Sequence, residues 1–374
     1  MVLYISISLI LLFLIFGFIF PEQLTGVTSQ MFAFITNDLG WFYLVTVLGI
    51  LVFSLYLAFS RFGKIRLGND DDRPEYSNFS WFAMLFSAGM GIGLVFWGVA
   101  EPLFHYAQPP MGIEPLSTQS AMMSFRYAFL HWGFHPWAIY AIVGLALAYV
   151  TFRKKMPCLI SSTLYPLFGE KTKGPIGHVI DILALILTVI GVATSLGMGA
   201  LQVNGGLNTL FNIPNTFNTQ VVIIIVITIL FLISATTGLD KGIKILSNTN
   251  IIIAVLLLLF VFLFGPTVFI IDTFFVSLSG YIQNLLPMSL ALSPFEKDPW
   301  IGTWTIFYWA WWLSWGPFVG TFIARISKGR TVKEFILGVV ILPAIFCCIW
   351  FTAFGGTALY FEIFEGADIV AQVT

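Results

Sequence analysis

The stretch Ser87-Ala88-Gly89-Met90-Gly91-Ile92-Gly93 interrupts an otherwise apolar, helix-forming run, and the fold prediction starts from it. A glycine inside a helix costs about 1 kcal/mol relative to alanine, so three glycines in five residues predict an unwound segment. A lipid bilayer offers freed backbone groups no partner, so such a segment survives only beside a cavity or within packed protein. Helices broken in this way are typical of transporter binding sites near the bilayer midplane.

The composition around this stretch is that of a membrane protein. Of the 374 residues, 58% are hydrophobic and only 9% are charged, and the mean hydropathy is +0.94. Soluble domains carry about 25% charged residues. This chain therefore lacks the charge to cover a water-facing surface, and its main partner is expected to be the lipid bilayer. The net charge of −1 and the lack of a basic patch exclude a nucleic-acid partner.

Nine apolar runs reach the length of about 20 residues that a helix needs to cross the bilayer. No long polar linker separates them, so residues 1–374 are predicted to form a single all-α, polytopic membrane domain. The first run has no basic segment before it and a poor cleavage site after it, which favours a retained helix over a signal peptide. The nine runs are 4–20, 40–60, 80–103, 128–152, 178–203, 220–238, 247–271, 303–326 and 336–361.

Lysine and arginine predict the orientation of the chain. Fifteen of the 17 basic residues follow the second, fourth, sixth or eighth run, and only Arg126 and Lys297 do not. Because basic loops stay in the cytoplasm, we expect a multi-pass plasma-membrane protein with a cytoplasmic N-terminus and with Thr374 outside. The outer segment 272–299 mixes apolar and polar residues, which predicts either an interfacial helix on the membrane surface or an ordinary packed loop.

A second unusual stretch, 304–318, places four tryptophans within seven residues of one span. At about 100° per residue, three of them share one side of the helix, and three further rings share one side of the fourth run. Such rings predict an aromatic cage for a quaternary ammonium, which has no N–H to donate and is attracted to ring faces by about 0.5–2 kcal/mol each. The rings are Trp311, Trp312 and Trp315, and Trp132, Trp137 and Tyr140.

Other interpretations of both stretches remain open. Gly89 and Gly93 form a GxxxG pattern, which can simply let two helices approach each other closely. Tryptophans also collect in belts at the membrane surface, which accounts for Trp41, Trp81 and Trp300. The clustered rings of the eighth run could also be coincidental core packing.

Few polar side chains lie within the runs. Glu101 and Asp181 are near the ends of their runs, so they are interpreted as capping or anchoring groups rather than as substrate ligands. Arg126 lies on the outer side, where it could pair with Glu101. His131 and His135 are four residues apart and could hold a metal, but no carboxylate or thiol stands beside them, so helix-end packing is the preferred interpretation.

At these residues the sequence resembles the betaine/choline/carnitine transporter family. The likeness rests on Gly302–Trp312, on Gly89–Gly93 with Glu101-Pro102, on His131–Tyr140 and on the inner loop Arg325–Thr331. It implies an inverted five-helix-repeat (LeuT-like) fold and a homotrimer. The chain would then consist of two leading helices (1–75), a first repeat (76–275), an outer interfacial segment (276–299) and the first two helices of an incomplete second repeat (300–374).

The resemblance also implies roles for individual residues. An aromatic box would hold the substrate cation, with further stations beside it and a gating ring, and two sodium ions would bind nearby. No cofactor and no metal ion other than sodium is expected. The implied substrate-binding residues are Trp132, Trp137, Tyr140, Trp312, Trp311, Trp315, Met90 and Phe96; the implied sodium-binding residues are Ser87 and Met90 for one ion, and Thr188 with Phe318 for the other; the unwound glycines are Gly89, Gly91 and Gly93.

The sequence departs from the family pattern in three places. Val192 stands where sodium-coupled members can carry a second threonine, which puts the second sodium site in question. Gly93 stands where choline-preferring members can carry an aspartate, which favours betaine. A complete second repeat would need five helices and only two are present, so a fragment or a truncated reading frame is expected.

These features together predict a secondary active transporter, not an enzyme, that imports glycine betaine or a related quaternary-ammonium solute with sodium for osmoprotection. Choline or carnitine uptake and sodium-independent exchange are alternatives within the same fold. A non-transporting membrane sensor or scaffold is an alternative of another class. An enzyme is not supported, because no Ser/His/Asp grouping or metal cluster lies within a span.

Overall fold

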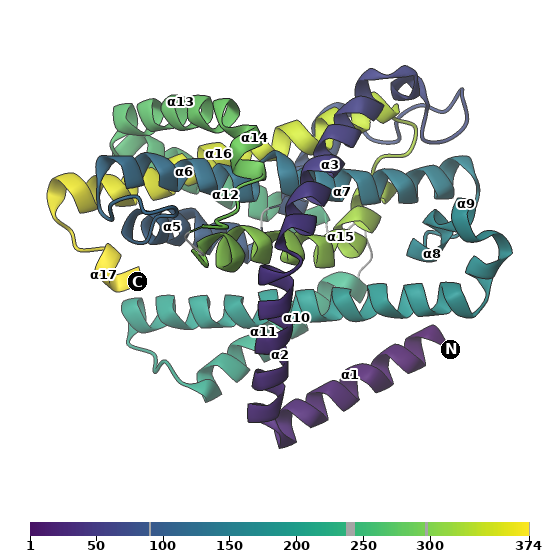
Figure 1. Ribbon diagram of the computed structural model, residues 1–374, viewed down its shortest axis with the longest axis horizontal. Helices are drawn as coiled ribbons and strands as arrows, with labels where there is room; N and C mark the ends of the chain where they lie inside the picture. The colour runs from purple at the N-terminus through teal and green to yellow at the C-terminus, as the bar shows by residue number, and fades with distance from the viewer. Residues whose placement is uncertain (90, 237–243, 296–297, 374) are drawn as a thin grey trace.

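The computed structural model describes the chain except for residues 90, 237–243, 296–297 and 374, and the described part is built from helices (Figure 1). Its extended pairing is limited to one isolated bridge between Arg66 and Thr331. The helices are α1 (Val2–Ile19), α2 (Pro21–Asn37), α3 (Gly40–Phe59), η1 (Arg61–Lys64), α4 (Asn78–Gly89), α5 (Ile92–Ala107), α6 (Thr118–Trp132), α7 (Phe134–Ala148), η2 (Tyr149–Arg153), α8 (Ile160–Thr163), α9 (Tyr165–Phe168), η3 (Gly169–Lys173), α10 (Pro175–Phe211), α11 (Phe217–Thr236), α12 (Lys244–Phe264), α13 (Thr267–Gln283), α14 (Leu285–Ser289), η5 (Gly302–Ile306), α15 (Phe307–Arg325), α16 (Val332–Glu365) and α17 (Val370–Val373).

The helices confirm an all-α, multi-pass membrane protein. Among the described residues, five helical segments are long and apolar enough to cross a bilayer: α1, α3, the continuous segment Thr118–Arg153, α10 and α16. A sixth is counted if the bent pair α12–α13 is one span. The described residues of each predicted run lie mainly on helices, but not every one of these helices reaches the length and hydropathy of a span, so a count of nine spans stays a prediction.

The predicted boundaries were wrong in two places. Helix α2 lies between the two leading spans, where no helix was predicted; it is too polar to give an apolar run, and Pro21 occupies its first turn. The fourth run begins at Thr118 rather than at residue 128, because the capping box between Ser117 and Ser120 starts the helix there, within a polar stretch that hydropathy does not detect.

A third difference concerns the segment after the seventh run. Helix α12 ends at Phe264, and α13 leaves at 110° to it through Gly265 and Pro266. Proline removes a backbone donor and clashes with the preceding turn, which accounts for the break. Residues 272–283 are helical, so an ordinary loop is wrong for this part of 272–299. Whether α13 lies on the membrane surface stays a prediction.

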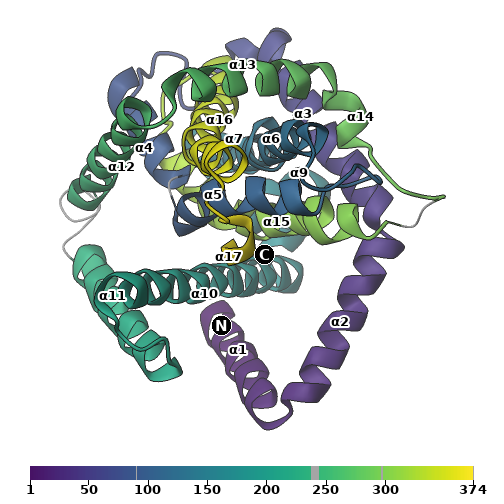
Figure 2. The ribbon, with the colours of Figure 1, turned by 90° about the vertical axis from the view of Figure 1, so that its left-hand side faces the viewer.

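The helices form a packed body with a looser periphery. Helix α7 packs against α15 and α16, and α5 packs against α6 and α16. Figure 2 shows these helices gathered together, whereas α10, α11, α1 and α2 lie along one side of them. Only 6% of the α1 window and 11% of the α10 window is buried, compared with 67% for α16. The peripheral helices therefore present apolar side chains outward, as lipid-facing helices do.

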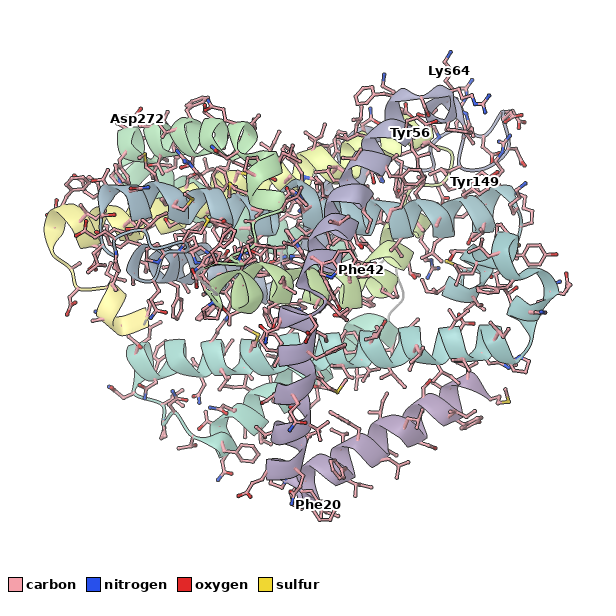
Figure 3. All side chains as sticks on the ribbon, viewed as in Figure 1. Phe20, Phe42, Tyr56, Lys64, Tyr149 and Asp272 are labelled. Atoms are coloured by element: carbon pink, nitrogen blue, oxygen red, sulfur yellow. The ribbon has the colours of Figure 1, made fainter. Side chains whose placement is uncertain are left out.

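The two ends of the body differ in charge. Figure 3 shows Lys64, in the loop after α3, and Tyr149, next to the basic segment 153–155, at the same end of the long axis. Asp272 on α13 lies at the opposite end, where Figure 1 also places the C-terminus. The basic residues of these two segments therefore lie at one end of the direction in which α7, α10 and α16 run.

Two basic loops are joined at the Lys64 end. The backbone pairs Leu67–Arg330, Gly329–Leu67 and Val332–Ile65 each form an N–H···O bond of 2.8 Å. Arg330 is 2% exposed, its guanidinium carbon lies 3.9 Å from the centre of the Trp81 ring, and it donates to Asn78 Oδ1 at 2.9 Å. The loop after α3 and the loop before α16 are thus one packed unit, which we call the loop clamp (residues 65–81 and 326–332).

The clamp also corrects the predicted tryptophan belt. Trp81 is 1% exposed and donates its indole N–H to Ser327 Oγ at 2.9 Å. Trp300 is buried as well, and it donates to the Gln108 carbonyl at 2.8 Å. Both rings fill the protein interior instead of facing lipid. Trp41, which is 56% exposed, remains compatible with a position at the membrane surface.

Candidate functional site

The glycine stretch breaks a helix, as predicted. Helix α4 ends at Gly89 and α5 begins at Ile92, with Gly91 at its N-cap in an extended conformation. The Gly91 N–H donates to the Gly89 carbonyl at 2.9 Å, which turns the chain between the two helices. Gly93 lies inside α5 rather than in the break. Ser87 is half-buried in the last turn of α4, and Met90 lies outside the described residues.

Two glycines leave room for the predicted aromatic rings. A Cβ atom on Gly89 would lie 2.6 Å from Cζ2 of Trp137, and one on Gly93 would lie 3.3 Å from Cη2 of Trp132. Gly91, by contrast, has nothing within 4 Å of that position. The GxxxG pattern does allow a close approach, but the groups that approach are indole rings rather than the backbone of another helix.

The four rings of the predicted box come together from three helices. Trp132 ends α6, Trp137 and Tyr140 are on α7, and Trp312 is on α15; each is at most 8% exposed. Trp132 meets Trp312 edge to face at 4.9 Å between centroids, Trp312 meets Tyr140 at 6.3 Å, and Tyr140 meets Trp137 at 5.7 Å. We call these four residues the aromatic cage. They face one another within the protein and not the surrounding lipid.

The other predicted aromatic residues differ in their relation to the cage. Trp311 stacks on Trp312 at 5.1 Å and 10°, so it extends the cage along α15. Trp315 lies against α10, where a Cβ on Gly191 would be 2.9 Å from its indole nitrogen, and its ring meets that of Phe318 at 5.6 Å. Phe96 is 37% exposed and packs on Trp97 at 5.0 Å. Roles for Trp315 and Phe96 in the substrate pathway stay predictions.

The predicted ligands of the second sodium ion lie on neighbouring helices. Thr188 is on α10 and Phe318 is on α15, and these two helices pack together. The Thr188 hydroxyl donates to the Ala184 carbonyl at 2.8 Å, so its oxygen lone pairs remain free to accept or to ligate. Val192 is 39% exposed and offers no oxygen from its side chain. Both sodium sites stay predictions.

A buried carboxylate adjoins the cage. Glu101 on α5 is 0% exposed, and its Oε2 accepts hydrogen bonds from Trp132 Nε1 at 2.7 Å and from the Tyr308 hydroxyl at 2.6 Å. Its Oε1 lies 2.7 Å from His131 Nδ1 and 3.2 Å from His105 Nε2. Glu101 therefore does not cap a helix end; it anchors α5 to α6 and α15 through side chains in the interior, which agrees with the anchoring alternative.

The histidines belong to the same network. His131 Nε2 lies 3.0 Å from the Thr305 hydroxyl, whereas His135 Nε2 lies 2.8 Å from the Ser289 hydroxyl. The two histidines thus have separate partners, as the preferred packing interpretation implies, but the Glu101 carboxylate that was not expected beside them does contact His131. The ligand atoms of Glu101, His105 and His131 all lie within 4.8 Å of one another, close enough to hold a metal ion. The same atoms are already hydrogen-bonded among themselves.

The prediction for Arg126 was wrong, whereas the prediction for Asp181 was confirmed. Arg126 does not pair with Glu101; its guanidinium lies against Gly280 of α13, where a Cβ atom would collide with it. Asp181 accepts from the backbone N–H of Ser161 at 3.0 Å and from its hydroxyl at 2.8 Å. Asp181 therefore ties α10 to the short helix α8, which confirms its predicted anchoring role.

The sequence alone could have indicated that Glu101 is a functional residue. An ionisable residue inside a membrane span is a functional candidate by default, because it must be matched by buried partners. Its partners could not be found by spacing, since Trp132, His131 and Tyr308 lie on other helices and at least 30 residues away. Helical periodicity could have predicted only one partner, His105, which is four residues later on α5.

Comparisons with known proteins show which family the chain belongs to. The family model described as BCCT, betaine/carnitine/choline family transporter, matches residues 1–374. The chain is 54% identical over 362 residues to the glycine betaine transporter OpuD of Bacillus subtilis (strain 168), covering 96% of this chain and 70% of that protein. It is 47% identical over 373 residues to an ectoine/hydroxyectoine transporter of Virgibacillus pantothenticus, covering 100% of this chain and 74% of that one.

A third relative is named for several substrates. The glycine betaine/proline/choline transporter of Vibrio parahaemolyticus is 43% identical over 379 residues, which covers 96% of this chain and 68% of the relative. Because the family model spans the full length and these relatives exceed 40% identity, the chain belongs to the betaine/carnitine/choline family and is a transporter rather than an enzyme.

Proposed function

We propose that this protein imports glycine betaine, or a closely related quaternary-ammonium solute, together with sodium, and so protects the cell against osmotic stress. The observation that supports this most strongly is the aromatic cage, four buried rings from α6, α7 and α15 that meet beside the break between α4 and α5. A trimethylammonium group bound there would gain about 0.5–2 kcal/mol from each ring. Several rings together would offset much of its lost hydration.

The relatives support a compatible solute as the substrate. The substrates in their names are glycine betaine, ectoine, hydroxyectoine, proline and choline, which all carry or can carry a positively charged nitrogen. Gly93 adds no charge of its own to the cage edge, and the absence of an aspartate there favours zwitterionic betaine over cationic choline. Choline or carnitine uptake and sodium-independent exchange are the alternatives that the uptake experiment separates.

Sodium coupling is proposed from energetics and from the predicted ligands. Thousandfold accumulation costs about 4 kcal/mol. One sodium ion entering down 100 mV supplies about 2.3 kcal/mol, and a tenfold gradient adds about 1.4 kcal/mol. One ion is marginal for a neutral zwitterion, whereas two suffice. Oxygens near Ser87 and Met90 would bind the first ion. Thr188 with Phe318 would hold a second ion only if Val192, which has no side-chain oxygen, does not disable that site.

The architecture and assembly are proposed on the same basis. Helices α4 to α12 would form a first five-span repeat, and α15 and α16 would begin an inverted second one. The basic end of the body would face the cytoplasm, which puts the N-terminus inside. The outward apolar faces of the peripheral helices are compatible with a homotrimer in the bilayer.

The central test is uptake of labelled betaine, choline, carnitine, proline and ectoine by cells that lack their own transporters, with sodium present or replaced by potassium. We expect sodium-dependent betaine uptake to be the strongest. Sodium-independent uptake would instead support exchange. Binding of betaine without uptake in either medium would support a non-transporting sensor.

Two matched variants test the cage itself. Trp312→Leu removes a cage ring, whereas Trp41→Leu removes a ring that is 56% exposed and packs on Phe42. We expect Trp312→Leu to raise the Kd for betaine by about 3- to 30-fold, as the loss of one cation–π contact requires. Trp41→Leu should leave the Kd unchanged. Equal effects of the two substitutions would refute the assignment of the cage.

A further inference from the structure

The Glu101 carboxylate is linked to the cage through two of its neighbouring rings. Trp132, whose indole N–H donates to Oε2, is a cage ring and meets Trp312 at 4.9 Å. Tyr308, whose hydroxyl donates to the same oxygen, stacks on Trp312 at 5.6 Å and 22° and on Trp311 at 5.9 Å and 14°. One carboxylate oxygen therefore fixes a cage ring and the ring that supports two others.

The partners of Glu101 are polar side chains without a permanent positive charge. Its hydrogen bonds come from indole, phenol and imidazole groups, and within the described residues its ion-pair partners are His105 and His131. No lysine or arginine among those residues pairs with it, because Arg126 lies against α13. The negative charge is therefore not balanced by a fixed cation in the described site, and a ligand cation in the cage would feel its field.

The hydrogen bond from Trp132 to Glu101 also strengthens the attraction of the cage for a cation. Hydrogen bonds polarise their partners inside a low-dielectric protein. An indole that donates its N–H to an anion gains electron density on the ring, and the attraction between a ring and a cation depends on the negative potential of the ring face. The carboxylate thus favours cation binding both directly and through the ring that it holds.

We propose that Glu101 determines the charge specificity of the cage: it positions Trp132 and Tyr308, and it makes the cage select for the positive charge of its ligand. This inference rests on the proposed function. It assigns Glu101 a positioning and electrostatic role, not contact with the substrate. The field of a carboxylate acts on the net charge of the ligand, so it should favour choline, a cation, more than betaine, whose own carboxylate is repelled.

The test compares Kd values for choline and for betaine, measured by calorimetry on the complete chain in nanodiscs. Glu101→Gln keeps the shape of the side chain and removes its charge. We expect the Kd for choline to rise about tenfold and that for betaine about threefold, so that the choline-to-betaine ratio rises about threefold. Glu101→Asp keeps the charge, so the ratio should stay within about twofold of the wild-type value even if both ligands bind more weakly.

The outcomes separate the two proposals. If the wild-type chain binds neither ligand, the proposed function fails. If the wild-type chain binds both and Glu101→Gln weakens both by the same factor, Glu101 is only structural and this inference is overturned, while the cage stands. Should Glu101→Gln fail to fold, Glu101→Asp and Glu101→Asn, which differ in charge alone, repeat the comparison: a higher ratio in the Asn variant supports the inference, and equal ratios overturn it.

Discussion

At the scale of single residues, the site depends on side chains that are missing as much as on those present. Gly89 and Gly93 have no Cβ, and the space this leaves is filled by the indoles of Trp137 and Trp132. The rings are also fixed at their edges, since Trp312 donates to the His131 carbonyl at 2.9 Å and Trp132 donates to Glu101. Small residues on one helix and hydrogen bonds on the others thus set where the ring faces lie.

A glycine substitution tests this arrangement. Gly89→Ala would place a methyl group 2.6 Å from Trp137, which must then move out of its position in the cage. Overpacking of this kind costs about 1–3 kcal/mol, so we expect the Kd for betaine, measured by tryptophan fluorescence, to rise about tenfold or more. Gly91→Ala is the control, because its methyl group would meet nothing within 4 Å. A larger effect of Gly91→Ala would contradict this account.

At the scale of elements, glycines, prolines and loop contacts determine where helices begin, end and bend, which hydropathy does not show. The α4–α5 break follows from the glycines and the α12–α13 bend from Gly265-Pro266, so both are encoded locally. The loop clamp is encoded by pairing between distant segments: residues 65–67 meet 329–332, and Arg330 lies against Trp81. The clamp therefore fixes the start of α4 relative to the start of α16.

The clamp makes a prediction about stability. Arg330→Lys keeps the charge but loses the planar fork that bonds Asn78 and stacks on Trp81. We expect a loss of about 2 kcal/mol, since hydrogen bonds to charged groups contribute about 1.5–3 kcal/mol, and a lower Tm in detergent. Arg325→Lys, at the exposed last residue of α15 just before the clamp, should leave Tm unchanged. Equal Tm values for the two variants would show that the clamp does not stabilise the fold.

The sequence predicted most of the elements that neighbouring residues encode, and it missed those that depend on contacts between distant helices. The apolar runs located the spans, and helical periodicity placed Trp137 with Tyr140 and Trp311 with Trp312 correctly. Helix α2 was missed because its polar residues hide it from hydropathy. The Glu101 network was also missed, because its partners come from α6, η5 and α15 and nothing in their spacing shows that these helices meet.

At the scale of the whole molecule, charge and apolar surface are arranged along different directions. Basic loops gather at one end of the long axis, whereas exposed apolar side chains cover the flanks formed by α1 and α10. This is the pattern of a protein that crosses a bilayer along its long axis. The buried cage lies within the packed body of α5, α6, α7, α15 and α16, away from the lipid-facing flanks.

Cysteine labelling tests the proposed orientation. Lys64→Cys and Asp272→Cys place thiols at opposite ends of the molecule (Figure 3), in a background with Cys158, Cys347 and Cys348 replaced by serine or alanine. A membrane-impermeant maleimide should label position 272 in intact cells and position 64 only in inverted vesicles, because basic loops stay in the cytoplasm. The reverse pattern would overturn the orientation.

Ion stoichiometry is a further property of the whole transporter. Because Val192 has no side-chain oxygen to add to a site at Thr188, we expect one sodium ion to move with each betaine. Parallel fluxes of labelled sodium and betaine in proteoliposomes of the full-length protein measure the ratio. A ratio of two would show that Val192 does not disable the second site.

The contact between Gly89 and Trp137 joins two properties that are usually measured separately. Any change in the angle between α4 and α5 moves the glycine backbone against the indole, so the conformation of the broken helix and the occupancy of the cage share a free-energy term. By reciprocity, a solute that stabilises one ring arrangement must shift the helices by the same amount that the helices shift its affinity. The affinity for the solute and the opening of the transport path would then depend on the same conformational equilibrium.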